Sequence, residues 1–87
     1  MHELSLIKDL MRKIEWIAEE NNAKKISSVT LRLGALAHIS AAHLREHFAV
    51  AVRGTNLEET RLNIDVSTDE AEPNAQDILL ASVEVEV

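Results

Sequence analysis

The fold is decided by the stretch SVTLRLG, residues 28–34, and the rest of the chain can be interpreted outward from it. Its apolar residues Val29, Leu31 and Leu33 alternate with polar ones, which predicts a strand that buries one face. Gly34 marks the end of this strand. Because only one face is apolar, we expect the sheet to be covered on one side only.

Amphipathic helices are predicted on both sides of this strand. Over about residues 4–21, apolar residues recur at helical spacing, and Glu3, Leu4 or Ser5 are all acceptable starts. The apolar stripe of this helix consists of Ile7, Leu10, Met11, Ile14, Ile17 and Ala18. After the strand, Ser40 suits an N-cap and Gly54 suits the end of a second helix. The stripe of the second helix consists of Leu44, Phe48, Ala51 and Val52.

Two further strands complete the predicted fold. The second strand alternates Leu62, Ile64 and Val66 with polar residues, and residues 68–76 are polar and form a loop. In the last strand the predicted apolar face is Leu79, Ala81, Val83, Val85 and Val87. The strand–helix–strand unit predicts parallel strands and the last strand an antiparallel one. We therefore expect an α+β two-layer sandwich, α-β-α-β-β, with two helices on one face of a three-stranded mixed sheet.

Composition excludes several classes of function. At 87 residues the chain is one domain, residues 1–87, and it contains no cysteine. Disulfides, thiolate zinc sites and iron–sulfur clusters are therefore excluded, and no structural zinc is expected. The net charge of −6, without a cluster of basic residues, argues against nucleic acid as a partner. No apolar run approaches the roughly 20 residues of a membrane span, so we expect a cytoplasmic protein.

The opening tripeptide Met1-His2-Glu3 is the strongest candidate for a metal site. A histidine at position 2 should leave Met1 in place, because methionine is removed only before small residues. The terminal amine, the amide nitrogens of His2 and Glu3, and the His2 imidazole can then converge on one ion. Fused chelate rings of this kind favour the square-planar ions Ni(II) and Cu(II). We expect these three residues to precede the first helical turn.

The sequence HLREH, residues 43–47, matches the H-x-x-E-H pattern of inverted zinc peptidases. A metallohydrolase built on His43, Glu46 and His47 is a remote alternative, because a further ligand and a cleft are required. Leu44 and Phe48 mark the buried stripe, so His47 is expected at its margin and His43 in solvent.

Several other polar or aromatic residues are expected to be exposed. Trp16 projects away from the apolar stripe of the first helix, where it covers the helix surface or contacts a partner. His38 is expected to be an ordinary loop residue. A solvated acidic face is predicted for Glu70, Glu72, Glu84 and Glu86.

Several segments spread over nearly the whole chain share one family pattern: MHELSL (1–6), VTLRLGAL (29–36), RLNI (61–64) and SVEV (82–85), with Leu44, Phe48 and Gly54-Thr55 in the second helix. In these segments the chain resembles the HypA/HybF family of hydrogenase nickel-incorporation proteins. It implies a nickel metallochaperone for a nickel enzyme, with [NiFe]-hydrogenase as the expected target. The implied ligands of Ni(2+) are Met1, His2 and Glu3. A GTPase and the hydrogenase large subunit are the implied partners, and no catalytic activity is implied.

The chain departs from this family in one place. HypA proteins carry a zinc lobe with two Cys-x-x-Cys pairs, and here its place is taken by the short, cysteine-free loop 68–76. The expectation is therefore a single nickel-binding domain without the lobe. A protein-interaction scaffold that keeps the fold but has lost metal delivery is the alternative. Exposed strand edges also leave pairing into a homodimer open.

Overall fold

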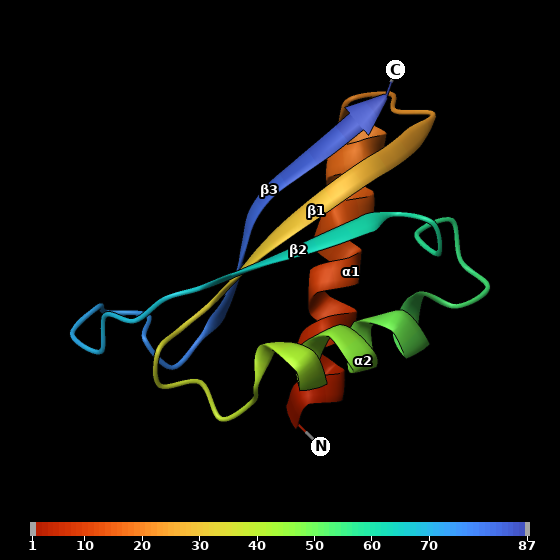
Figure 1. Ribbon diagram of the computed structural model, residues 1–87. Helices are drawn as coiled ribbons and strands as arrows, with labels where there is room; N and C mark the ends of the chain where they lie inside the picture. Colours follow the sequence, from red (N-terminus) through yellow and green to blue (C-terminus); the bar gives the residue numbers. More distant parts are fainter. Residues whose placement is uncertain (1, 87) are drawn as a thin grey trace.

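The computed structural model describes residues 2–86 and shows the elements in the predicted order (Figure 1). They are α1 (His2–Glu20), β1 (Lys25–Leu33), α2 (Ala41–Val52), β2 (Arg61–Val66) and β3 (Ile78–Glu86). The α-β-α-β-β order is therefore confirmed. The start of α1 was predicted too late, since the helix already includes His2 and Glu3.

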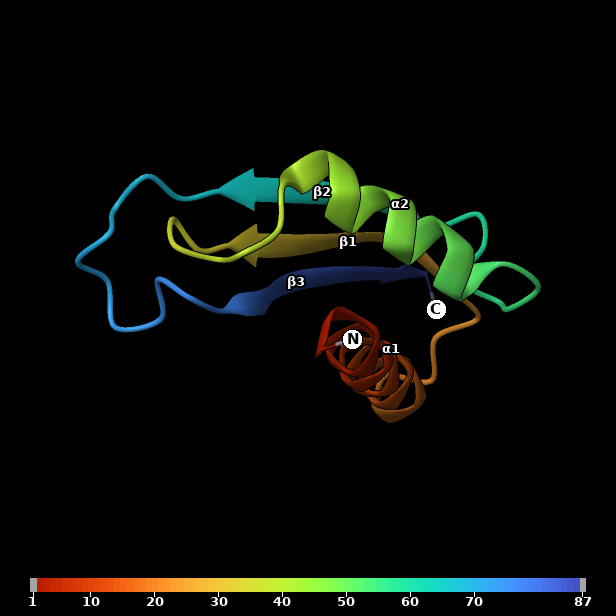
Figure 2. The same cartoon turned by 90° about the horizontal axis from the view of Figure 1, so that it is seen from below.

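The three strands form one mixed sheet in the order β2-β1-β3. Strand β1 lies in the centre, parallel to β2 with Val29 opposite Leu62, and antiparallel to β3 with Val29 opposite Val83. Both predicted strand directions are confirmed. In Figure 2, α2 lies against β2 and α1 lies beside β3, and α1 also contacts β1.

One core joins both helices to a single face of the sheet. Alternate residues of β1 point into this core, and the buried stripes of α1 and α2 complete it. Because Val29, Leu31 and Leu33 share one face of the strand, both helices must cover that same face. The main contributors from the helices are Ile7, Leu10, Ile14, Leu44, Phe48 and Val52. The predicted two-layer architecture is confirmed.

The predicted helix ends are explained by local chemistry. The Ser40 side chain accepts a hydrogen bond from the backbone N–H of His43 at 3.1 Å, which caps α2. Gly54 follows α2 with φ +79°, a left-handed conformation that costs glycine little. Asn22 adopts φ 51° just after α1, as expected for a residue type that tolerates this region.

The predicted face of β3 is wrong in its first part. Ile78 is buried and Leu80 packs on the core, whereas Leu79 is 38% exposed and Ala81 is exposed. The cause is a bulge: Thr30 and Leu31 are consecutive on β1, but their partners on β3 are Ser82 and Leu80. The extra residue Ala81 inverts the alternation of side chains, so simple alternation cannot be extended across it.

A comparable irregularity lies near the start of β1. The pairing shifts between Ile26 and Ser28, which allows Ile26 as well as Val29 to face the core. Strand β1 consequently extends to Lys25, three residues before the stretch that predicted it.

Within residues 2–86, neither helix combines the length and the apolar character that a membrane crossing requires.

Trp16 is 62% exposed on α1, as predicted. We expect Trp16→Ala to lower the free energy of unfolding by only about 0.5 kcal/mol, because the indole is not in the core. Ile14→Ala on the same helix is the matched control, since Ile14 is fully buried and its truncation should cost about 2–5 kcal/mol. Urea unfolding followed by circular dichroism measures both, and equal losses would contradict this placement of Trp16.

Candidate metal site

The first turn of α1 contains two of the three predicted ligands. His2 and Glu3 are the first two residues of the helix, and Met1 lies outside the described residues. The expectation that residues 1–3 all precede the helix is therefore wrong for His2 and Glu3. In Figure 1 this turn extends past α2 to the rim of the molecule.

The backbone amides of these two residues are still available for nitrogen coordination. The first N–H groups of an α-helix have no acceptor within the helix, so the amides of His2 and Glu3 give up no helical hydrogen bond when they bind an ion. The positive end of the helix dipole also favours the loss of a proton from a nearby amide. The helix start therefore offers backbone nitrogens that are free to act as ligands.

The H-x-x-E-H sequence lies on α2, where both histidines have the predicted exposure. His43 is exposed and His47 is half-buried beside Phe48. Their imidazole rings lie close together, with centres 4.6 Å apart. Among the side chains that the structure describes, those of residues 7–86, no three of His, Cys, Asp or Glu gather as a metal-binding group. The metallohydrolase alternative thus lacks a third ligand in the described part of the chain. The remaining histidine of the loop before α2, His38, is exposed, as expected.

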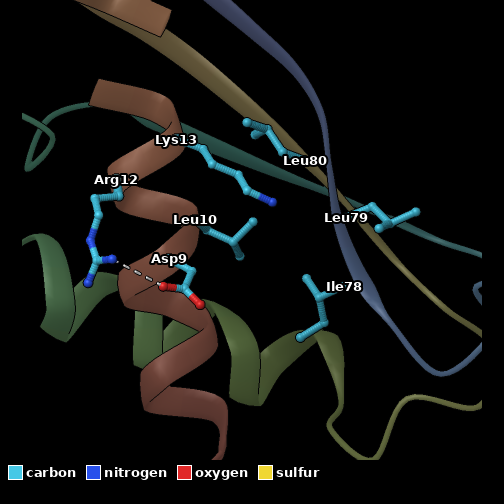
Figure 3. A pocket seen from close by; sticks show the side chains of 7 residues that line it. All are labelled: Asp9, Leu10, Arg12, Lys13, Ile78, Leu79 and Leu80. Atoms are coloured by element: carbon cyan, nitrogen blue, oxygen red, sulfur yellow. Dashed lines mark ion pairs between the residues drawn. The ribbon is translucent and has the colours of Figure 1, made fainter. Parts of the chain in front are cut away.

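A pocket of about 290 Å³ lies between α1 and β3 (Figure 3). Leu10 and Lys13 of α1 and Ile78 of β3 line it, and Arg12 forms an ion pair with Asp9 at 3.7 Å on its rim. Both of these charges are exposed, so their attraction is weak. The lining brings together no set of ligands and no nucleophile with a base, and the pocket is therefore not a candidate for the metal site.

The segment between β2 and β3 extends beyond the sheet and contacts the end of β1 and the residues after it (Figure 1). Arg32 of β1 donates a hydrogen bond to Glu72, forming an ion pair, and the Ser67 hydroxyl donates to the same carboxylate at 2.9 Å. The prediction that Glu72 belongs only to a solvated acidic face is therefore wrong. Glu84 likewise accepts a hydrogen bond from the hydroxyl of Ser28. These contacts join residues far apart in the sequence, so local pattern could not reveal them.

The hydrogen bond from Arg32 and that from Ser67 lower the pKa of the Glu72 carboxyl. A carboxyl whose pKa is lower in the folded state stabilises the fold above its unfolded pKa, and this contribution is lost as the pH falls through the folded value. We therefore expect Glu72→Gln to reduce stability at neutral pH and the difference from the wild type to disappear in acid. Urea unfolding at several pH values measures it. Glu70→Gln in the same exposed loop is the control, and an equal effect there would contradict the assignment.

Comparison with known proteins identifies one family of similar sequences. A family model described as "Hydrogenase/urease nickel incorporation, metallochaperone, hypA" matches residues 1–75. The hydrogenase maturation factor HypA of Archaeoglobus fulgidus is 39% identical over 66 residues, which are 76% of this chain and 60% of that protein. The factor of the same name from Chloroflexus aggregans is 42% identical over 65 residues, 75% of this chain and 57% of that protein. The chain thus spans about three-fifths of the length of these relatives.

Solved structures agree on the fold. The solution structure of the Ni metallochaperone HypA from Helicobacter pylori superimposes with a TM-score of 0.78 and 15% identity, covering 97% of each chain. A second HypA solution structure gives a TM-score of 0.75 and 20% identity, covering 98% of this chain and 96% of that one. At these identities the match supports the architecture alone.

Proposed function

Because this chain belongs to the HypA family of hydrogenase/urease nickel-incorporation proteins, we propose that it is a nickel metallochaperone for the maturation of a nickel enzyme. The enzyme that we propose as its target is [NiFe]-hydrogenase. The observation that carries the proposal is the family match, which begins at residue 1 and includes Met1-His2-Glu3. The function is to bind, carry and hand over an ion, which requires no catalytic group.

The proposed ligands are Met1, His2 and Glu3. The amine of Met1, the amide nitrogens of His2 and Glu3, and the His2 imidazole are the nitrogens that these residues would offer to Ni(II), a donor type that this ion favours. Five-membered chelate rings need backbone torsions near planarity, whereas the helical ψ is about −42°. Nickel binding should therefore draw His2 and Glu3 out of the first turn of α1. Protonation of the amides on hand-over would let that turn re-form.

The proposed partners are a GTPase of the nickel-insertion pathway and the large subunit of hydrogenase. The support is the shared name of the relatives, which are hydrogenase maturation factors. We further propose that residues 1–87 act as a single nickel-binding domain. The loop 68–76 would then close the end of the sheet where the family carries a zinc lobe.

No structural zinc should be required for folding. The core of two helices and three strands is apolar, aliphatic except for Phe48, and the chain contains no cysteine to supply a thiolate. We therefore expect the far-ultraviolet circular dichroism and the thermal midpoint to stay unchanged after exhaustive treatment with a strong chelator. A large loss of helical signal on chelation would reveal a metal that holds the fold together.

Nickel titration of the chain with a free, untagged N-terminus tests the proposed function. We expect one tightly bound ion per chain by calorimetry and its loss in His2→Ala. The alternative is a protein-interaction scaffold that keeps the fold without carrying metal. A chain that is folded but binds no nickel tightly would favour that scaffold and overturn the metallochaperone proposal.

A further inference from the structure

Helix α2 carries a second pair of metal-binding side chains, independent of the N-terminus. His43 and His47 lie one helical turn apart, with ring centres 4.6 Å apart and ring planes inclined by 31°. We propose that they form a two-histidine site, called the clamp below, for one divalent transition-metal ion that favours imidazole nitrogen, Ni(II) or Cu(II). This site does not rest on the proposed function.

The separation of the two rings fits a shared ion. A metal–nitrogen bond of about 2.1 Å puts the centre of an imidazole ring about 3.2 Å from the ion. Two rings at a right angle around the ion then have centres about 4.5 Å apart, and at the tetrahedral angle about 5.2 Å. The observed 4.6 Å matches the right angle, which octahedral and square-planar ions adopt.

The two nitrogens can converge with little movement of either ring centre. The terminal torsion of histidine is broad, and rotation about it turns the ring almost about its own long axis. The backbone that carries both residues is fixed, because Leu44 and Phe48 are buried and Ser40 caps the helix. The clamp therefore needs only a side-chain rotation, and little conformational entropy is lost on binding.

The surroundings leave the pair open to an ion. His43 is exposed and His47 half-buried, so water or a small ligand can fill the remaining coordination positions. Arg45, two residues from each histidine, lies on the other side of the helix and donates a hydrogen bond to the Leu62 carbonyl at 2.8 Å. This guanidinium is thereby held away from the clamp. An ion held by only two protein ligands should dissociate readily. We therefore expect this site to bind nickel more weakly than the proposed N-terminal site.

The test uses the full chain with the N-terminal site removed, that is, N-acetylated and carrying His2→Gln. We expect calorimetry with Ni(II) to show one weak site per chain in this background. His43→Gln or His47→Gln should each weaken it about tenfold or more, because the second ligand then no longer benefits from chelation. His38→Gln, an exposed histidine outside the pair, should leave it unchanged.

A register variant is the matched control. His47→Ala combined with Ala49→His keeps the number of histidines but moves one ring away from His43 around the helix. Binding should fall as far as in the single variants, with circular dichroism confirming that α2 is intact. In the N-acetylated His2→Gln protein with α2 unchanged, paramagnetic Ni(II) should broaden the nuclear magnetic resonance signals of the ring protons of His43 and His47 before that of His38. Absence of binding in the acetylated background, or equal binding by the register variant, would overturn the clamp.

Discussion

Gly34→Ala is expected to lower the free energy of unfolding by about 2–4 kcal/mol, although it adds a single methyl group. A Cβ at Gly34 would lie 2.2 Å from the carbonyl oxygen of Ala75 and 2.6 Å from its carbonyl carbon. Both atoms are backbone, so no side-chain rotation relieves the contact. The segment before β3 must move instead, which strains the hydrogen bonds from Gly34 N–H to Asp77 at 2.9 Å and from Leu36 N–H to Ala75 at 2.7 Å.

Gly54→Ala separates this steric effect from the cost of losing a glycine. Nothing lies within 4 Å of a Cβ at Gly54, but its φ of +79° disfavours any residue with a side chain. We expect a loss of about 1 kcal/mol there, and less for Gly54→Asn, since asparagine tolerates this conformation. Urea unfolding measures all three variants. If Gly34→Ala cost no more than Gly54→Ala, the close contact between the first strand and the last loop would be disproved.

The parts of the fold that could be predicted from sequence are those set by neighbouring residues. The strand ending at Leu33, the Ser40 cap and the left-handed Gly54 depend on residues within a few positions of one another. The first half of β3 could not be predicted, because the bulge at Ala81 is a property of its pairing with β1. Alternation continued through Ala81 placed Leu79 on the wrong face.

Some features of the candidate site could likewise be predicted from the sequence, and others could not. The histidine spacing on α2 followed from the helical period, and so did the exposure of both rings. The role of Glu72 could not be predicted, because its partner Arg32 is 40 residues away and only the fold of the loop between β2 and β3 brings the two together. The terminal ligands were proposed from the chemistry of Met1-His2-Glu3 and from the family resemblance, and they remain a proposal.

Three chemically different changes at the N-terminus should each abolish tight nickel binding. His2→Ala removes the imidazole, an N-terminal tag displaces and blocks the amine, and N-acetylation removes the basicity of the amine while every side chain stays the same. Only a site that uses both the amine and the His2 side chain is sensitive to all three. Glu3→Gln should have a milder effect, because the amide nitrogen of residue 3 survives the change.

The spectrum and the fold provide the controls for this result. Nickel bound through deprotonated amide nitrogens should absorb visible light, so this absorption should appear with the first equivalent and be absent from all three blocked forms. The three forms should unfold at the same urea concentration as the unmodified apo chain, because each change is confined to Met1 or His2 and leaves the buried residues Ile7, Leu10 and Ile14 intact. Since nickel draws only His2 and Glu3 from the helix, its binding should cost no more than about one turn of helical signal. Full-strength binding by the acetylated or His2→Ala protein would disprove the terminal site, and the metallochaperone proposal would then need another ligand set.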